Sequence, residues 1–202
     1  MTGIGGDDRA GMNLFHRLFA QRALHLFRDR RGAVIVEFAF VAIPFIALML
    51  AILQTSLVYF AAEALETGVE ASARSVITGK AQLADATGRT LGMTDAELAE
   101  RYRKAACAAL PTFLKCANLL VEVKSAATWG TIDSAVPTLT YDSTGKVTNN
   151  FAYDLGSGGA IVLVRLMYPW PIEADPLVLL ANRGKRSRLL VATSVGKSEA
   201  YQ

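Results

Sequence analysis

The stretch RDRRGAVIVEFAFVAIPFIALMLAILQTSLVYFAA, residues 28–62, decides the fold of this 202-residue chain. From residue 38 to residue 62 it contains 25 successive residues without a charge. As an α-helix, that run would span roughly 37 Å, which exceeds the ~30 Å hydrocarbon core of a bilayer. The stretch therefore predicts one transmembrane helix over residues 33–62. A buried core helix is the alternative, but such helices are usually shorter and amphipathic.

The distribution of charge predicts how this helix is oriented. Residues 1–32 carry six arginines against three aspartates, whereas basic and acidic residues balance in the rest of the chain. Because positive residues are retained in the cytoplasm, we expect residues 1–32 to be a cytoplasmic basic leader and the bulk of the chain to lie outside. The apolar run is too long for an ordinary secretory signal. The pI near 8.9 then reflects the leader, so nucleic-acid binding is not expected.

Beyond the membrane, the apolar residues recur at intervals of three and four. This spacing predicts that the helix continues outward to about Thr78, before Gly79, and we assign residues 63–80 to an amphipathic helical stalk. The apolar face begins before the stalk and comprises Val58, Ala62, Leu65, Val69, Ser72 and Val76. Residues 81–202 would then form a separate small domain.

The small domain is predicted to be of the α+β class. Residues 83–91 favour a short helix, and Thr94 with Glu97 forms a capping box for a helix that ends near Leu110, before Pro111. Residues 119–129, 160–171 and 187–196 are rich in Val, Ile and Leu at strand length. Between the first two, residues 142–146 favour a turn and residues 156–159, Gly-Ser-Gly-Gly, a flexible loop. We expect an antiparallel sheet covered by helix.

Two cysteines, Cys107 and Cys116, lie nine positions apart in the part expected outside. In an oxidising compartment this pair favours a disulfide. Two free thiols in a reduced compartment are the alternative.

The sequence gives no indication of catalysis, a cofactor or a metal. Both histidines, His16 and His25, lie in the leader, which leaves the outer domain without the commonest general base and metal ligand. No spacing pairs the outer carboxylates for acid–base chemistry, so we interpret them as solvated charges: Asp133, Asp142, Asp154, Glu173 and Asp175. The Gly-rich loop precedes a predicted strand and not a helix, which argues against a phosphate site.

Glu37 is the unusual feature of the apolar stretch. A carboxylate near the helix centre costs about 2.5 kcal/mol or more in lipid, and less near the edge, where the side chain can reach the interface. Glu37 could therefore simply extend toward the headgroups. Alternatively it could have a partner, because a cut between Gly32 and Ala33 would create an ammonium about one helical turn before it. In a bundle of such helices, that ammonium could pair with the carboxylate of a neighbour.

These residues carry a resemblance. Arg30-Arg31-Gly32, four further residues, Glu37-Phe38 and an apolar helix resemble the processing motif of type IV pilin-like proteins, which a prepilin peptidase cleaves after the glycine. Residues 28–79 are similar to the amino-terminal half of the TadE-like family, minor pseudopilins of the tight-adherence (Tad/Flp) pilus apparatus. Paired cysteines followed by a strand are also similar to members of that family. Phe38 departs from the tyrosine that is common in the related major pilins.

The resemblance implies that Gly32 and Ala33 form the peptidase site and that Glu37 and Phe38 act in assembly. It implies a single-pass protein of the bacterial inner membrane with a periplasmic α+β domain and no enzymatic activity. The implied partners are other pilin and pseudopilin subunits, the Tad secretion machinery, the prepilin peptidase and the lipid bilayer.

Two other functions are open at this stage. A membrane-anchored periplasmic binding or sensing module would keep its leader and begin at Met1, whereas a processed pseudopilin would begin at Ala33. A tethered hydrolase would need a catalytic constellation that cannot be assembled in the outer domain without histidine.

Overall fold

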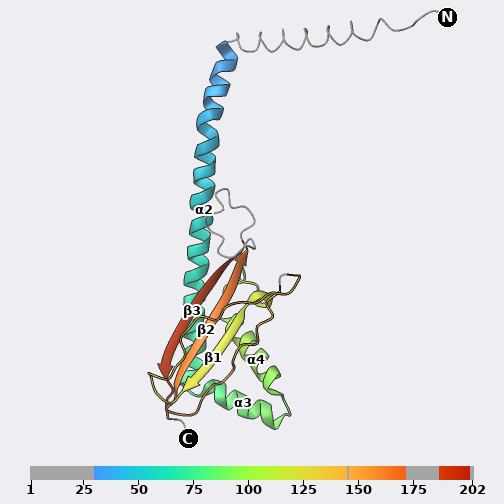
Figure 1. Ribbon diagram of the computed structural model, residues 1–202, viewed down its shortest axis with the longest axis vertical. Helices are drawn as coiled ribbons and strands as arrows, with labels where there is room; N and C mark the ends of the chain where they lie inside the picture. Colours follow the sequence, from blue (N-terminus) through green and yellow to red (C-terminus); the bar gives the residue numbers. More distant parts are fainter. Residues whose placement is uncertain (1–29, 145, 172–186, 201–202) are drawn as a thin grey trace, which may run out of the picture. The chain divides into compact units, whose positions relative to one another are not determined.

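The computed structural model describes residues 30–144, 146–171 and 187–200, with side chains from residue 34 onward. The chain divides into two compact units, Met1–Ile52 and Leu53–Gln202. The described elements are α2 (Arg30–Ile77), α3 (Lys80–Thr90), α4 (Asp95–Ala108), the 3₁₀ turn η1 (Cys116–Asn118), β1 (Leu120–Ala126), β2 (Ile161–Pro171) and β3 (Ser187–Lys197) (Figure 1). A long helix, two further helices and an antiparallel sheet confirm the predicted α+β class. Glu173 and Asp175 lie outside the described residues, as do residues 1–29 of the leader with His16 and His25.

Helix α2 is continuous for 48 residues and includes Pro44. It ends where the sequence predicted, because Gly79 adopts the left-handed conformation with φ 76°, which costs glycine little and other residues more. The amide of Gly79 donates to the carbonyl of Val76 at 3.1 Å and closes the last turn.

Helices α3 and α4 follow in quick succession. The capping box at the start of α4 is confirmed: Thr94 Oγ1 accepts from the Glu97 amide at 3.3 Å, and the Thr94 amide donates to Glu97 Oε2 at 2.8 Å. The hydrogen bond from the Thr94 backbone also lowers the pKa of Glu97. Helix α3 begins three residues earlier than the predicted segment, directly after Gly79.

The three strands form one sheet in the order β1-β2-β3, with both pairs antiparallel. Strand β1 is shorter than predicted, since it ends at Ala126 and leaves Trp129 in the following loop. The reason is its partner: Ala126 pairs with Ile161, the first residue of β2, so no β2 residue is available beyond it. Gly159, with φ 84°, lies two residues before β2 in the loop that ends there.

One face of the sheet packs against the C-terminal part of α2. A hydrophobic core cluster joins buried residues of α2 and α4 to Val162, Val164, Leu166 and Tyr168 of β2. Within α2, Ala61 is fully buried, whereas Ala62, which the spacing placed on the apolar face, is only partly buried. The C-terminal part of α2 is thus the core helix of the C-terminal unit, and its buried residues are Val58, Ala61, Leu65, Gly68, Val69, Ser72, Ala73 and Val76.

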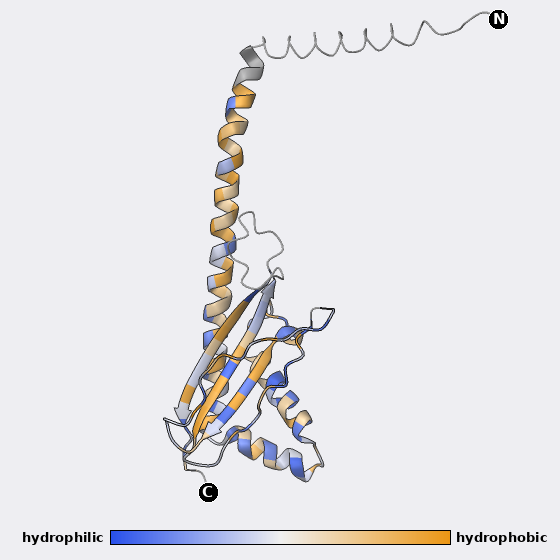
Figure 2. Cartoon of the chain, viewed as in Figure 1, coloured by the Kyte–Doolittle hydropathy of each residue, from blue (hydrophilic) through white to orange (hydrophobic). Residues whose placement is uncertain are grey.

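The other face of β2 is also buried, which the sequence did not indicate. Ile161, Leu163, Arg165 and Met167 alternate with the core residues of β2 and are at most 2% exposed. The long β1–β2 connection covers this face, because the carbonyls of Ser134 and Ala135 accept hydrogen bonds from Arg165. Figure 2 shows the hydrophilic bands that interrupt β1 and β2. Burial on both faces explains why β2 reads as a nearly continuous apolar run.

Candidate functional site

The N-terminal part of α2 carries the residues that the sequence singled out. Gly32 and Ala33 lie within the first turns of the helix. Glu37 and Phe38 follow on its exposed surface, and Phe38 is 72% exposed. Among residues whose side chains the structure describes, Glu37 has no hydrogen bond or ion pair. A partner for its carboxylate must therefore come from outside that part of the chain.

Large apolar side chains surround Glu37 on all sides of the helix. Each of these side chains is between 51% and 78% exposed, and they are Val34, Ile35, Val36, Phe38, Phe40, Val41, Ile43, Phe45, Ile46, Leu48, Met49 and Leu50. Figure 2 shows this part of α2 as almost wholly hydrophobic. A helix that is apolar on every side is normally buried in protein or spans a membrane. Within the described chain, α2 is the one helix long and apolar enough to cross a bilayer, over Val34–Ile77.

Pro44 lies in the middle of this segment and does not interrupt the helix. A proline lacks the amide that would donate to the carbonyl four residues earlier. Such a position is tolerated in a membrane helix when a neighbour or water satisfies the freed carbonyl.

A disulfide joins Cys107 of α4 to Cys116 of η1, across a sequence separation of nine. Because β1 starts four residues after Cys116, the bond fixes the end of α4 to the start of the sheet. Arg103 of α4 strengthens this junction, since its guanidinium donates to the carbonyl of Cys116 and lies 2.7 Å from both carboxylate oxygens of Glu100. The hydrogen bond from Arg103 lowers the pKa of Glu100.

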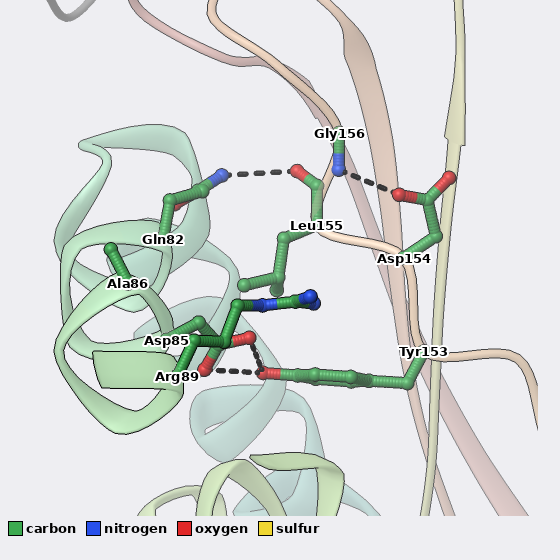
Figure 3. Close-up of a pocket in the computed structure, with 8 residues that line it drawn as sticks. All are labelled: Gln82, Asp85, Ala86, Arg89, Tyr153, Asp154, Leu155 and Gly156. Carbon is green, nitrogen blue, oxygen red and sulfur yellow. Dashed lines mark hydrogen bonds between the residues drawn. The ribbon is translucent and has the colours of Figure 1, made fainter. Parts of the chain in front are cut away.

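A pocket of about 280 Å³ lies between α3 and the loop before β2 (Figure 3). Asp85 is 7% exposed at its wall, and it accepts hydrogen bonds from Tyr153 at 3.0 Å and from Arg101 at 2.6 Å. Burial, followed by the negative charge of Asp85, raises the pKa of Tyr153. Asp85 and Tyr153, the two groups bonded here, are thus already engaged with each other, and the pocket is lined by Gln82, Asp85, Ala86, Arg89, Tyr153, Asp154, Leu155 and Gly156.

The carboxylates interpreted as solvated charges have local roles. Asp133 is 2.8 Å from Lys124, whose hydrogen bond lowers the pKa of Asp133. Asp142 closes the predicted turn by accepting from the amides of Thr144 and Lys146. Asp154 accepts from the Gly156 amide at the start of the glycine-rich loop. In the described residues, no three or more His, Cys, Asp or Glu side chains are grouped to hold a metal ion.

Sequence reasoning missed a buried ion pair between Arg165 and Glu122. The side chain of Arg165 is 1% exposed and that of Glu122 is 5% exposed, and the two residues lie opposite each other in the β1–β2 register. Lys124 approaches the second carboxylate oxygen of Glu122 at 3.1 Å. Two sequence features could have indicated this pair: the single arginine, Arg165, in an otherwise apolar predicted strand, and the charged residues Glu122 and Lys124, two positions apart in the preceding strand.

Comparison with known proteins gives one match. Residues 32–74 match the model of the TadE-like protein family. This is the family that the sequence resembled, and the match runs from Gly32 through Glu37 to Arg74 in the C-terminal part of α2. No curated protein and no solved structure matches the chain. Together, the TadE-like segment and the candidate membrane helix support a membrane-anchored protein related to the Tad pilus system.

Proposed function

We propose that this chain is a TadE-like minor pseudopilin of the Tad/Flp pilus apparatus, which acts by assembly with other subunits and not by catalysis. It would be a single-pass protein of the bacterial inner membrane, with a cytoplasmic N-terminus and a periplasmic C-terminal unit. The observation that carries the proposal is Glu37, an acidic side chain without a partner in the described chain, within the segment that matches the TadE-like family.

Processing would supply the partner. Cleavage after Gly32 by a prepilin peptidase would leave the ammonium of Ala33, four residues before Glu37 and therefore on the same side of the helix. In a bundle of these helices, the ammonium of one subunit could pair with the carboxylate of its neighbour. Because the surroundings have a low dielectric constant, leaving either charge unpaired would cost several kcal/mol.

Phe38 and the apolar side chains around it would provide the rest of the contact. Without a hydrophobic driving force between helices in lipid, close packing and paired polar groups hold helices together. Glu37 would thus specify the axial register of neighbouring subunits, and the apolar surface would supply contact area.

The amino terminus of the mature protein tests the processing step. Mass spectrometry of protein extracted from membranes should find Ala33 at the amino terminus in cells that express the peptidase, and Met1 in cells that lack it. The variant Gly32→Val should remain uncleaved, because a branched side chain crowds the peptide bond that the protease must approach. A mature protein that begins at Met1 in peptidase-positive cells would instead favour an anchored binding or sensing module.

Substitution of Glu37 tests the assembly step separately. Glu37→Leu should insert into the membrane and be cleaved as well as wild type, since removing a carboxylate from lipid is favourable. It should fail to co-purify with other pilus subunits. Glu63→Leu is a matched control, because it removes another exposed carboxylate of α2, beyond the uncharged stretch, and should leave co-purification intact. Normal assembly of Glu37→Leu would contradict the pairing.

A further inference from the structure

Four aromatic side chains lie together in the C-terminal unit, near the end of the uncharged stretch of α2. Phe60 of α2 stacks on Phe113 with 5.4 Å between ring centroids, and Phe113 meets the ring of Trp170 edge-on at 6.4 Å. Tyr168 lies 6.3 Å from Trp170. We call these four residues the aromatic cluster. They come from α2, the segment after α4 and the end of β2, so the cluster exists only in the folded unit.

The aromatic cluster has a buried side and an open side. Tyr168 is 3% exposed, and its hydroxyl accepts a hydrogen bond from the Lys115 amide at 3.1 Å. By contrast, Phe60 is 60% exposed and Phe113 is 40% exposed. Described residues therefore hold the cluster in place from one side and leave large aromatic surface uncovered on the other. Contiguous exposed apolar surface commonly marks an interaction site.

Within the last turns of the uncharged stretch, an apolar stripe leads to the aromatic cluster. Leu53, Leu57 and Phe60 are spaced by four and three residues, so they lie on one face of α2. Leu53 is 58% exposed and Leu57 is 48% exposed. The first charge after the uncharged stretch is Glu63, about one turn beyond Phe60. The cluster thus lies at the end of the apolar surface, where a bilayer would give way to water.

The sheet runs along the outer part of α2 and brings Trp170 to the same level as Phe60. At the far end, a Cβ placed on Gly196 would lie 2.5 Å from Ile77 Cδ1, and Gly196 pairs with Val162 near the start of β2. From Ile77 back to Phe60 the helix covers about 25 Å. From Val162 to Trp170 the strand covers about 26 Å. These lengths match, so Trp170 lies level with Phe60, and the ring of Phe113 bridges the two.

We infer that the aromatic cluster is a membrane-interface anchor and that its occupant is the headgroup layer of the lipid bilayer. Tryptophan and tyrosine concentrate at this layer because they combine apolar rings with polar groups. Two basic residues adjoin the cluster, Lys115 through its amide and Arg188 opposite Trp170 in the β2–β3 register. Long cationic side chains at such positions reach lipid phosphates. The anchor fixes one end of the sheet on the bilayer, and the inference rests on the membrane span proposed above.

Fluorescence of the two tryptophans tests this inference in the full chain. Trp129 is 60% exposed and follows β1 at the opposite end of the sheet, so it is an internal reference. Single-tryptophan variants, Trp129→Phe and Trp170→Phe, are reconstituted in phosphatidylcholine–phosphatidylglycerol vesicles. The vesicles contain a lipid with a nitroxide near the top of its acyl chain. Trp170 emission should be quenched by this lipid, whereas Trp129 emission should be quenched by aqueous acrylamide and not by the lipid.

Two variants test whether quenching of Trp170 depends on the aromatic cluster in particular, and not on exposed apolar residues in general. In the background that retains Trp170, Phe113→Ser should weaken quenching by the nitroxide lipid. Leu91→Ser is the matched control, since Leu91 is 78% exposed after α3 and should leave quenching unchanged. If Trp170 is shielded from both quenchers, protein and not lipid covers the cluster, and the inference is overturned. If acrylamide alone quenches Trp170, the cluster faces water and the inference is equally overturned. If alkaline carbonate extracts the protein from the vesicles, the chain does not span the membrane. That outcome overturns the proposed function as well as this inference.

Discussion

Replacement of Arg165 by methionine should strongly destabilise the C-terminal unit. Methionine keeps much of the aliphatic volume but removes all the donors of the guanidinium. In the wild type these donors bind Glu122, the carbonyl of Ala135 at 2.9 Å and the carbonyl of Ser134 at 2.8 Å. The variant leaves a carboxylate that is 5% exposed and two backbone acceptors without these partners.

The expected magnitude follows from the burial of the pair. Removing one member of a buried ion pair typically costs 3–5 kcal/mol, because the other charge is left uncompensated. Lys124 lies 3.1 Å from Glu122 and would offset part of that cost. We therefore expect a loss of about 3 kcal/mol in the free energy of unfolding, a large share of the ~5–15 kcal/mol of an ordinary domain.

The measurement is guanidinium-induced unfolding of the full chain in detergent micelles, followed by near-UV circular dichroism. Arg188→Met is a matched control, since Arg188 is a partly exposed arginine of the neighbouring strand, and its free energy of unfolding should change by less than about 0.5 kcal/mol. The double variant Arg165→Met/Glu122→Leu should be more stable than Arg165→Met alone, because it removes the stranded carboxylate. The reasoning is refuted if Arg165→Met loses less than about 1 kcal/mol, or if the double variant is the less stable of the two.

Three further predictions concern the same unit and the same unfolding measurement. Cys107→Ser should lower the free energy of unfolding by about 2.5 kcal/mol, the value for closing so short a loop, and wild-type Cys107 and Cys116 should resist alkylation until reductant is added. Gly68→Leu should destabilise by more than about 2 kcal/mol, because a Cβ at that position would lie 2.2 Å from Leu110 Cδ2; a stability equal to wild type would show that Leu110 moves aside freely. Burial raises the pKa of Tyr102 above its usual value, so the stability that its neutral hydroxyl contributes is complete below about pH 10 and declines as the pH rises further. Tyr102→Phe should therefore lose about 1 kcal/mol at pH 7, through its missing bond to the Ser72 carbonyl, and should fall less steeply than wild type above pH 10.

The sequence by itself determined the features that depend on neighbouring residues. The uncharged run and the three-and-four spacing defined α2 almost to its last residue, because helix periodicity and a left-handed glycine act locally. The capping box of Thr94 and Glu97 is likewise complete within four residues. The TadE-like resemblance also rests on one continuous segment, which the family match covers from Gly32 to Arg74. The roles of Gly32, Ala33, Glu37 and Phe38 remain predictions, because their partners are other molecules.

Tertiary structure alone decided which distant residues meet. The end of β1 at Ala126 depends on where β2 begins, 35 positions later in the chain, and local propensity carries no information about that pairing. Arg165 could only be assigned to a buried ion pair once the register placed it opposite Glu122 and the β1–β2 connection covered that face. The aromatic cluster likewise required α2 and β2 to lie alongside each other over equal lengths. Local sequence sets the period and the ends of each element, whereas register and packing follow from burying the apolar faces of elements that are far apart in the chain.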